Sequence, residues 1–261
     1  MSRRGFDAME RILRRTKLAR ALTRRRRCAR LLRWEPKDEE RRRFYAAFVG
    51  PGDLCFDVGA NLGNRTKVFL ALGARVVAVE PQEECLEVLR AVYGSDSRIV
   101  LEDRALAREE GVGELLVSDA HTLTSMSPAW IGAVRQSGRF GTYGWDEVRR
   151  VGTTTLDRLI ETHGIPAFVK IDVEGFEEQV VRGLSRPVRA LSLEFTPEFA
   201  PSTFACIDHL ASLGPLTLNY TLGESAELAL EDWVGAGVLR EELEKLLGDA
   251  TVFGDVYVRF G

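Results

Sequence analysis

From Asp53 onward, short apolar runs of β-forming residues alternate with segments of helical periodicity. The runs lie at residues 54–58, 75–80, 98–101, 167–172, 190–195, 216–220 and 256–260. Most of them are continuously apolar and do not alternate with polar residues, which is typical of parallel strands covered on both faces. We therefore predict an α/β fold with a doubly wound, mostly parallel seven-stranded sheet and helices on both faces.

The regular alternation stops between residues 105 and 155. This stretch holds one strand-like run at 114–117 and then a Ser/Thr/Gly-rich segment with large aromatic residues, namely Trp130, Phe140, Tyr143 and Trp145. We interpret it as an insertion after the third strand, on the substrate side of the site. Its aromatic side chains either shape a substrate pocket or pack on one another, and the sequence favours neither alternative.

The N-terminal segment is strongly basic. Residues 1–43 carry 17 Lys and Arg against 6 Asp and Glu, although the whole chain has a net charge of −3. The consecutive arginines 24–27 are a candidate contact for nucleic acid or an anionic membrane. Apolar residues also recur there at roughly helical spacing, including Leu22, Leu31 and Leu32, so we expect amphipathic helices laid against the catalytic domain with arginines toward solvent.

Residues 44–261 are expected to form the catalytic domain. This part shows no further basic stripe, so we expect no nucleic-acid partner. It also shows no stretch near the roughly 20 apolar residues that cross a bilayer. The N-terminus lacks the apolar centre of a secretory signal, and the scattered cysteines (Cys28, Cys55, Cys85, Cys206) indicate buried thiols rather than disulfides or a zinc site. We expect a cytoplasmic protein, and the sequence is silent on its oligomeric state.

A glycine-containing turn follows the first strand, with the sequence Asp-Val-Gly-Ala-Asn-Leu-Gly at residues 57–63. Gly59 allows a sharp turn and a close ligand approach, and Gly63 allows close packing where the next helix begins. The spacing differs from the G-x-G-x-x-G of dinucleotide sites. It favours a nucleoside that carries an amino-acid group, with Asp57 at the ammonium, directly or through water, and loop amides at the carboxylate.

Two further acids follow the next strands. Glu80 ends the second strand, where a carboxylate can accept both hydroxyls of a ribose. Asp103 lies just past the third strand and could accept a hydrogen bond from an adenine amino group. Each acid alone fits a solvated strand end or a helix cap. Three acids at successive strand ends, Asp57 included, favour a nucleoside pocket.

These residues and several later segments resemble the FkbM family of methyltransferases. The later segments are Val-Glu-Pro at 79–81, Thr-Leu-Asp-Arg-Leu at 155–159, Lys-Ile-Asp-Val-Glu-Gly-Phe-Glu at 170–177 and Leu-Glu at 193–194. The resemblance spans about residues 53–195. It implies a Rossmann-like class I methyltransferase fold, S-adenosyl-L-methionine as the methyl donor, and typically O-methylation of a sugar, a polyketide or another specialised metabolite.

The resemblance also assigns residues by position. It implies that the cofactor is lined by Asp57, Gly59, Asn61, Gly63 and Glu80. Asp103 falls where the family often has a polar residue near the adenine. Ser125 matches a serine of the family insertion and is expected to face the cofactor. The basic residues 1–43 lie outside the match, which therefore says nothing about their role.

Methyl transfer to a hydroxyl requires in-line approach and removal of the hydroxyl proton. Asp172 ends the fourth strand, so we expect it beside the methyl group of the cofactor and consider it the first candidate base. His121 is the alternative because its intrinsic pKa is more suitable, and Glu194 is expected to orient the substrate. Asp172 and Glu174 could instead only hold their loop, with Lys170 as a structural partner.

We expect no resident metal, although Asp172, Glu174 and Glu194 are oxygen ligands of the kind that Mg²⁺ accepts. The leading hypothesis is an O-methyltransferase that acts on a small-molecule hydroxyl. Two alternatives remain open: methylation of RNA or protein recruited through the basic arm, and a cofactor-binding scaffold without catalysis. The sequence does not identify the acceptor.

Overall fold

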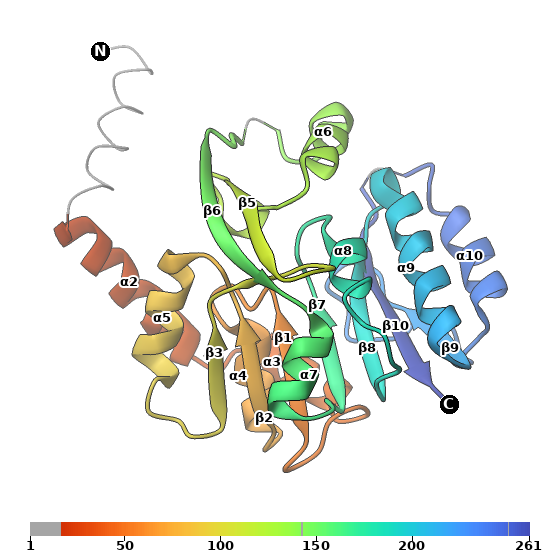
Figure 1. Ribbon diagram of the computed structural model, residues 1–261, viewed down its shortest axis with the longest axis horizontal. Coiled ribbons are helices and arrows are strands. Elements are labelled where there is room, and N and C mark those ends of the chain that lie inside the picture. The colour runs from red at the N-terminus through yellow and green to blue at the C-terminus, as the bar shows by residue number, and fades with distance from the viewer. Residues whose placement is uncertain (1–16, 142, 250) are drawn as a thin grey trace.

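The computed structural model describes residues 17–141, 143–249 and 251–261, and a seven-stranded sheet forms its centre (Figure 1). The strands run in the order β3-β2-β1-β7-β8-β10-β9. Their bounds are β1 Leu54–Val58, β2 Arg75–Val79, β3 Ile99–Glu102, β7 Phe168–Ile171, β8 Ala190–Phe195, β9 Leu216–Tyr220 and β10 Gly254–Phe260. β10 is antiparallel to β8 and β9, whereas β3, β2, β1, β7 and β8 pair in parallel. The predicted α/β fold with a mostly parallel sheet is confirmed.

Helices cover both faces of this sheet, as the sequence predicts (Figure 1). One face packs against α3 (Pro36–Tyr45), α4 (Asn64–Ala71) and α5 (Glu83–Tyr93), and the other against α7 (Leu156–His163), α8 (Glu177–Val181), α9 (Ala200–Leu213) and α10 (Ala236–Glu244). Side chains alternate along each strand, so Cys55 joins the first core while Phe56 and Val58 join the second. This double burial explains why the strands read as continuous apolar runs.

Residues 105–155 form a second, smaller sheet of β4 (Ala105–Leu106), β6 (Glu147–Thr154) and β5 (Gly111–Val117). The chain between β5 and β6 contains the short helix η1 (His121–Leu123) and α6 (Pro128–Ser137). Figure 1 shows β5, β6 and α6 above the carboxyl ends of the parallel strands. The insertion therefore stands where open α/β sheets bind their ligands.

The aromatic residues of this insertion pack on one another. Trp130 lies 5.8 Å from Phe140 and 6.5 Å from Trp145 between ring centroids. The Trp145 indole N–H donates to the Leu123 carbonyl, and Tyr143 is exposed. Of the two alternatives that the sequence left open, the structure shows self-packing, with a satellite core under the insertion.

The N-terminal arm is only partly amphipathic. In the described part of it, α2 (Lys17–Leu32) packs against α5. Leu31 is buried, but Leu22 and Leu32 are 51% and 69% exposed, so the expectation that both face the domain is wrong. Packing at one end of the helix is enough to hold it. Arginines 24–26 face solvent as expected.

The expected domain boundary after residue 43 falls inside α3. The last residue of this helix, Tyr45, is buried, and its ring centroid lies 5.0 Å from that of Phe69 and 5.5 Å from that of Phe168. Because these rings belong to the central core, α3 is part of the catalytic domain rather than of a separate arm. Side chains toward the start of the chain, at residues 1–16, lie outside the described residues.

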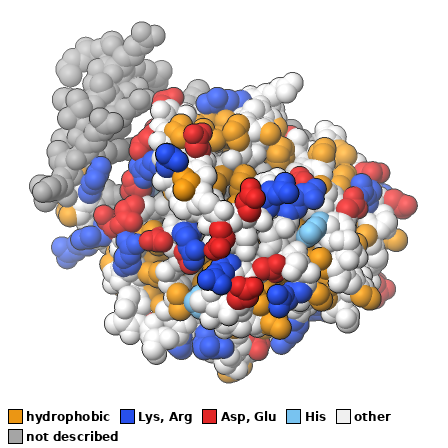
Figure 2. Space-filling model, viewed as in Figure 1, with side chains coloured by type: hydrophobic (Ala, Val, Ile, Leu, Met, Phe, Trp, Pro, Cys, Tyr) orange, Lys and Arg blue, Asp and Glu red, His pale blue; other side chains and the backbone are white. Residues whose placement is uncertain are grey.

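The surface carries both charges in a mixed pattern. Figure 2 shows Lys and Arg interspersed with Asp and Glu over the visible face rather than gathered in one patch. Cys55, Cys85 and Cys206 are buried and unpaired, and Cys28 is free and half-buried, in line with the expected thiols. Among the described residues, every helix is too short or too polar to traverse a lipid bilayer.

Candidate active site

A cavity of about 290 Å³ lies at the carboxyl ends of β1, β2, β7 and β8, under the insertion. Its size is at the lower end of the range for small-molecule sites. Three groups of side chains line the cavity. The first comes from the ends of β1 and β2, and the second from the ends of β7 and β8. The third comes from the insertion, from the helices α3 and α4, and from the connection between β9 and α10. The polar members are Arg41, Asp57, Asn61, Asn64, Arg65, Glu80, Gln82, His121, Thr122, Thr124, Lys170, Asp172, Glu174, Glu194 and Glu224.

The turn after β1 has left-handed backbone at three positions, Gly59, Asn61 and Gly63, with φ values of 77°, 51° and 86°. A Cβ atom on Gly59 would lie 1.8 Å from the carbonyl oxygen of Asp172, and one on Gly63 would lie 2.7 Å from Leu89 Cδ2. The close approach of the β1 and β7 loops therefore requires glycine at 59. The expected close packing at Gly63 is present as well.

Asp57 is buried beneath this turn and lines the cavity. Its carboxylate accepts a hydrogen bond of 2.5 Å from the Thr66 hydroxyl. Burial raises the pKa of Asp57, while the Thr66 hydrogen bond and the positive charges of Lys170 and Arg65 oppose that rise. The carboxylate is thus held in place and still has lone pairs for a ligand.

Glu80 is buried at the end of β2 and is held by two backbone groups. Its Oε2 accepts from the N–H of Asn61 at 2.7 Å, and its Oε1 accepts from the N–H of Gln82 at 2.8 Å. Burial raises the pKa of Glu80 to about 7, although these hydrogen bonds lower it. Each carboxylate oxygen keeps one more lone pair, so the group can accept two additional donors from a ligand.

His121 joins the insertion to the loops around Glu80. Its carbonyl oxygen accepts from Asn61 Nδ2 at 3.2 Å and from Gln82 Nε2 at 3.0 Å. Burial lowers the pKa of His121 to about 4, helped by the nearby charges of Arg27 and Arg30, so the ring is neutral at pH 7. Its Nδ1 is buried without a hydrogen-bond partner among the described residues.

Three residues that the sequence placed at the cofactor, Gly63, Asp103 and Ser125, do not line the cavity. The Asp103 side chain is 66% exposed and lies 4.0 Å from Arg90, although Asp103 directly follows β3 as Glu80 follows β2. Ser125 is buried, and its hydroxyl donates to the Glu174 carbonyl oxygen at 2.6 Å. In this structure Ser125 supports the loop of Glu174 instead of facing the cavity.

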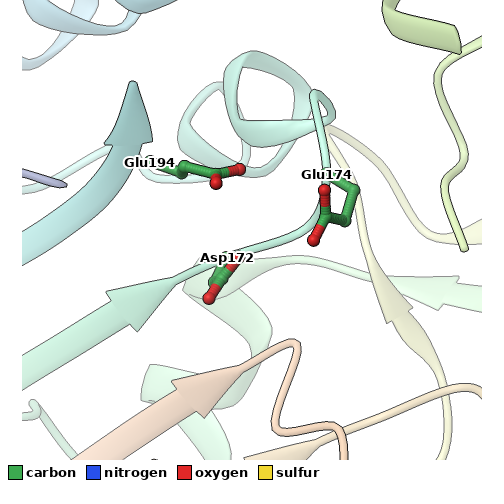
Figure 3. Close-up of side chains that lie close together, drawn as sticks. All are labelled: Asp172, Glu174 and Glu194. Carbon is green, nitrogen blue, oxygen red and sulfur yellow. The ribbon is translucent and has the colours of Figure 1, made fainter. Parts of the chain in front are cut away.

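Three acids, Asp172, Glu174 and Glu194, face a common gap from the end of β7, the following loop and β8 (Figure 3). One carboxylate oxygen of each lies within 4.8 Å of the others. Burial and mutual repulsion raise the pKa values of Glu174 and Glu194 above the usual range. Within the described ranges this is the one cluster with enough oxygen ligands for a cation such as Mg²⁺.

Lys170 lies buried below these acids and orders one of them. Its Nζ is 2.9 Å from Asp172 Oδ2 and 3.7 Å from Asp255 Oδ1. Burial opposes the ammonium charge, yet the two carboxylates raise the pKa of Lys170 above its usual value. Asp172 therefore has the structural partner that the sequence left as an alternative to catalysis, while its side chain remains 38% exposed at the cavity.

Glu177 supports the site, although the sequence alone suggested no role for it. It is buried, and its Oε1 accepts from the N–H of Val173 at 3.0 Å and of Gly175 at 3.3 Å, so it holds the loop that carries Glu174. Its place as the last acid of the 170–177 segment was the available signal. Burial raises the pKa of Glu177 to about 7.

We expect Glu177→Gln to stabilise the protein above neutral pH. The pKa of Glu177 is about 7 in the folded protein and 4.5 in the unfolded chain. The free energy of unfolding is therefore highest below pH 4.5 and falls as pH rises toward 7, because only the unfolded chain loses the proton in this range. A glutamine oxygen can still accept both N–H groups and does not ionise. Urea unfolding should show a gain of at most about 3 kcal/mol at pH 8 and little change at pH 4.5. A gain or loss that is the same at both pH values would contradict the shifted pKa.

The sheet order, the glycine turn after the first strand and the acid at the end of the second define a Rossmann-like methyltransferase fold. The family model described as the methyltransferase FkbM domain matches residues 57–214, more than half of the chain. The protein therefore belongs to the FkbM methyltransferase family, as the resemblance indicated.

No curated protein sequence matches the chain. Among solved structures, precorrin-6Y C5,15-methyltransferase from Geobacter metallireducens is 9% identical with a TM-score of 0.42, over 85% of this chain and 87% of that one. An rRNA methylase from Streptococcus thermophilus is 10% identical with a TM-score of 0.39, over 84% of this chain and 94% of that one.

Proposed function

We propose that the protein is an S-adenosylmethionine-dependent O-methyltransferase that acts on a hydroxyl of a small molecule. The observation that carries this proposal is the shared cavity of Glu80, Asp57 and the three acids of the β7 and β8 ends. A nucleoside donor needs a fixed carboxylate for its ribose, and Glu80 is held by backbone groups. A hydroxyl acceptor needs a carboxylate that takes its proton, and the acids of the β7 and β8 ends provide this. The family membership supports methyl transfer, and the choice of oxygen rests on the acids.

The residues around Glu80 fit the adenosine part of the donor. Glu80 has spare lone pairs for ribose hydroxyls, and the unpartnered Nδ1 of His121 is a buried polar atom beside the same loops. Asp57 has spare lone pairs for an ammonium group. When bound, S-adenosylmethionine would supply an electrophilic methyl group. The chain positions the two reactants and removes the proton.

The acids at the β7 and β8 ends are the proposed proton acceptors. Burial and the neighbouring carboxylates raise the pKa values of Glu174 and Glu194, which makes each carboxylate a stronger proton acceptor. Lys170 fixes the position of Asp172, which keeps that carboxylate as a further candidate base. His121 is a weaker candidate, because its lowered pKa makes it a poor base and its backbone is tied to the Glu80 loops.

Removing the base should lower turnover without weakening the cofactor complex. We expect Glu194→Gln or Asp172→Asn to reduce kcat by about 10²–10⁴-fold with the best hydroxylated acceptor found in a panel of sugars and phenols. The affinity for S-adenosylhomocysteine should change by less than about 3-fold, since that ligand needs no base. Glu178→Gln, which removes an acid paired with Arg182 on the surface of α8, is the matched control and should retain full activity. Equal losses of turnover and affinity would contradict a base at these positions.

Metal dependence is tested separately. We expect EDTA to leave turnover unchanged, because Lys170 already supplies a cation beside Asp172. Steady-state rates before and after chelation, with Mg²⁺ added back, make the comparison. Loss of turnover on chelation and its recovery with Mg²⁺ would assign the three acids to a cation instead.

One observation favours a second candidate, methylation of RNA or protein recruited through α2. Arginines 24–26 are exposed, and Arg24 makes the one ion pair recorded for them, 3.7 Å from Glu87. Replacing these three arginines by glutamine should abolish salt-sensitive RNA binding if this candidate is right. Under the leading proposal, RNA binding is weak in both the wild type and the variant.

Methyl transfer to any acceptor would exclude the third alternative, a cofactor-binding scaffold without catalysis.

A further inference from the structure

Three cations converge on one carboxylate in the wall of the cavity. Glu224 Oε2 accepts from Arg41 Nη2 at 2.5 Å and from Arg65 Nη2 at 3.2 Å, and lies 3.3 Å from Lys37 Nζ. The participants come from α3, the first turn of α4 and the connection between β9 and α10. Arg41, Arg65 and Glu224 all line the cavity. The two arginines therefore face a ligand space, unlike an ordinary surface ion pair.

The two guanidinium groups are not satisfied by this arrangement. The Nε atoms of Arg41 and Arg65 are both buried and have no hydrogen-bond partner among the described residues. A guanidinium presents five N–H donors, and each of these two groups donates one hydrogen bond, to Glu224. A buried donor without a partner is unfavourable by about 1–3 kcal/mol. Two such donors on one cavity wall indicate that an acceptor belongs there.

The neighbouring acids are engaged elsewhere. Asp38, 3.9 Å from Arg41 Nη1, accepts from Lys67 Nζ at 2.5 Å and from the Glu35 N–H at 2.8 Å. Asp57 is bound to Thr66. Asp172 and Asp255 flank Lys170, as described above. Among the described residues, Glu224 is therefore the carboxylate that accepts hydrogen bonds from Arg41 and Arg65, and it lies next to Lys37.

The three cations act strongly on the ionisation of Glu224. Burial raises its pKa, but Arg65, Arg41 and Lys37 outweigh burial and lower the pKa to about 2. Its side chain is 46% exposed, so the cations hold it ionised from outside the core. Arginine recognises a carboxylate with a planar pair of donors. The hydrogen bonds to Glu224 show that Arg41 and Arg65 can bind a carboxylate together.

We propose that Arg41 and Arg65 form a binding site for a ligand carboxylate, next to that of Glu224. The carboxylate comes from one of two sources: the amino-acid end of the methyl donor, or an acidic group on the acceptor. The choice of these two sources rests on the proposed function. In the first case, the two arginines would act together with the loop amides that we expect at the donor's carboxylate.

The test compares S-adenosylhomocysteine with 5′-methylthioadenosine, which shares its adenosine and thioether but lacks the amino-acid group. Calorimetry on the full chain gives both affinities for the wild type, Arg41→Met and Arg65→Met. If the donor supplies the carboxylate, each variant should bind S-adenosylhomocysteine about 10–100-fold more weakly, while the affinity for 5′-methylthioadenosine stays within about 2-fold. If the wild type binds neither ligand, the proposed function fails before this inference is reached.

Two kinds of control distinguish a loss of ligand binding from a loss of folding. Arg158→Met removes an exposed arginine of α7 and should alter neither affinity. Arg41→Lys and Arg65→Lys keep the charge but lose the planar pair of donors, so they should fall between the wild type and the methionine variants. The lysine variants also preserve the test if the methionine variants do not fold, as judged by circular dichroism.

The second source is tested with succinate as the probe. If the affinity for S-adenosylhomocysteine is unchanged in every variant, the complex with that ligand should bind succinate in the wild type and not in Arg41→Met. That result assigns the site to an acidic acceptor. The inference is overturned if both nucleosides weaken equally, or if neither nucleoside nor succinate distinguishes the variants from the wild type.

Discussion

Glu80→Ala should weaken the binding of S-adenosylhomocysteine by about 100-fold, equivalent to about 2.7 kcal/mol. The carboxylate is the acceptor that we assign to the ribose hydroxyls, and hydrogen bonds to a charged group contribute about 1.5–3 kcal/mol each. The change also leaves the N–H groups of Asn61 and Gln82 without their partner, which loosens both loops of the pocket. Isothermal titration calorimetry measures the loss directly.

Asp103→Ala is the matched control for this prediction. Asp103 follows the neighbouring strand, as Glu80 follows β2, but its side chain is exposed and lies outside the cavity. Its removal should change the affinity by less than about 2-fold, within the effect of a screened surface charge. The assignment of the adenosine pocket is wrong if Glu80→Ala binds like the wild type, or if both variants lose the same affinity.

Gly59→Ala is expected to have the largest effect on stability, about 4 kcal/mol. The residue has a φ of 77°, which alone is unfavourable for alanine by about 1–2 kcal/mol. The added Cβ would also lie 1.8 Å from the Asp172 carbonyl oxygen, so the β1 and β7 loops must separate. Losses of this size are diagnostic of such backbone collisions. Urea unfolding measures the change in the free energy of unfolding.

Gly52→Ala separates the two contributions. Gly52 has a φ of 83°, but a Cβ atom there would meet nothing within 4 Å. Gly52→Ala should therefore lower the free energy of unfolding only by the contribution of the left-handed backbone, about 1 kcal/mol. Equal losses at Gly52 and Gly59 would show that the close approach of the two loops contributes nothing.

The sequence predicted the sheet and one end of the site well, because both depend on local patterns. Continuous apolar runs indicate buried parallel strands, and parallel strands end at the same edge of a sheet. Asp57 and Glu80 each follow such a run, so their meeting at the cavity follows from topology. Asp172 and Glu194 meet for the same reason, although their partner Lys170 acquires its role only from burial between two carboxylates.

The remaining features depend on tertiary contacts that no local pattern encodes. Asp103 directly follows β3 as Glu80 follows β2, but the Asp103 side chain is exposed whereas Glu80 is buried. Three aromatic residues of the insertion, Trp130, Phe140 and Trp145, pack on one another. Arg41 and Arg65 reach the cavity because α3 and α4 converge on Glu224, which lies 159 residues beyond Arg65 in the chain.

A crystal structure of the protein with S-adenosylhomocysteine tests the central claim most directly. We expect ribose hydroxyls within about 3.2 Å of the Glu80 carboxylate, and the sulfur facing the gap between Asp172, Glu174 and Glu194. A ligand bound outside this cavity, or a ribose turned away from Glu80, would contradict it.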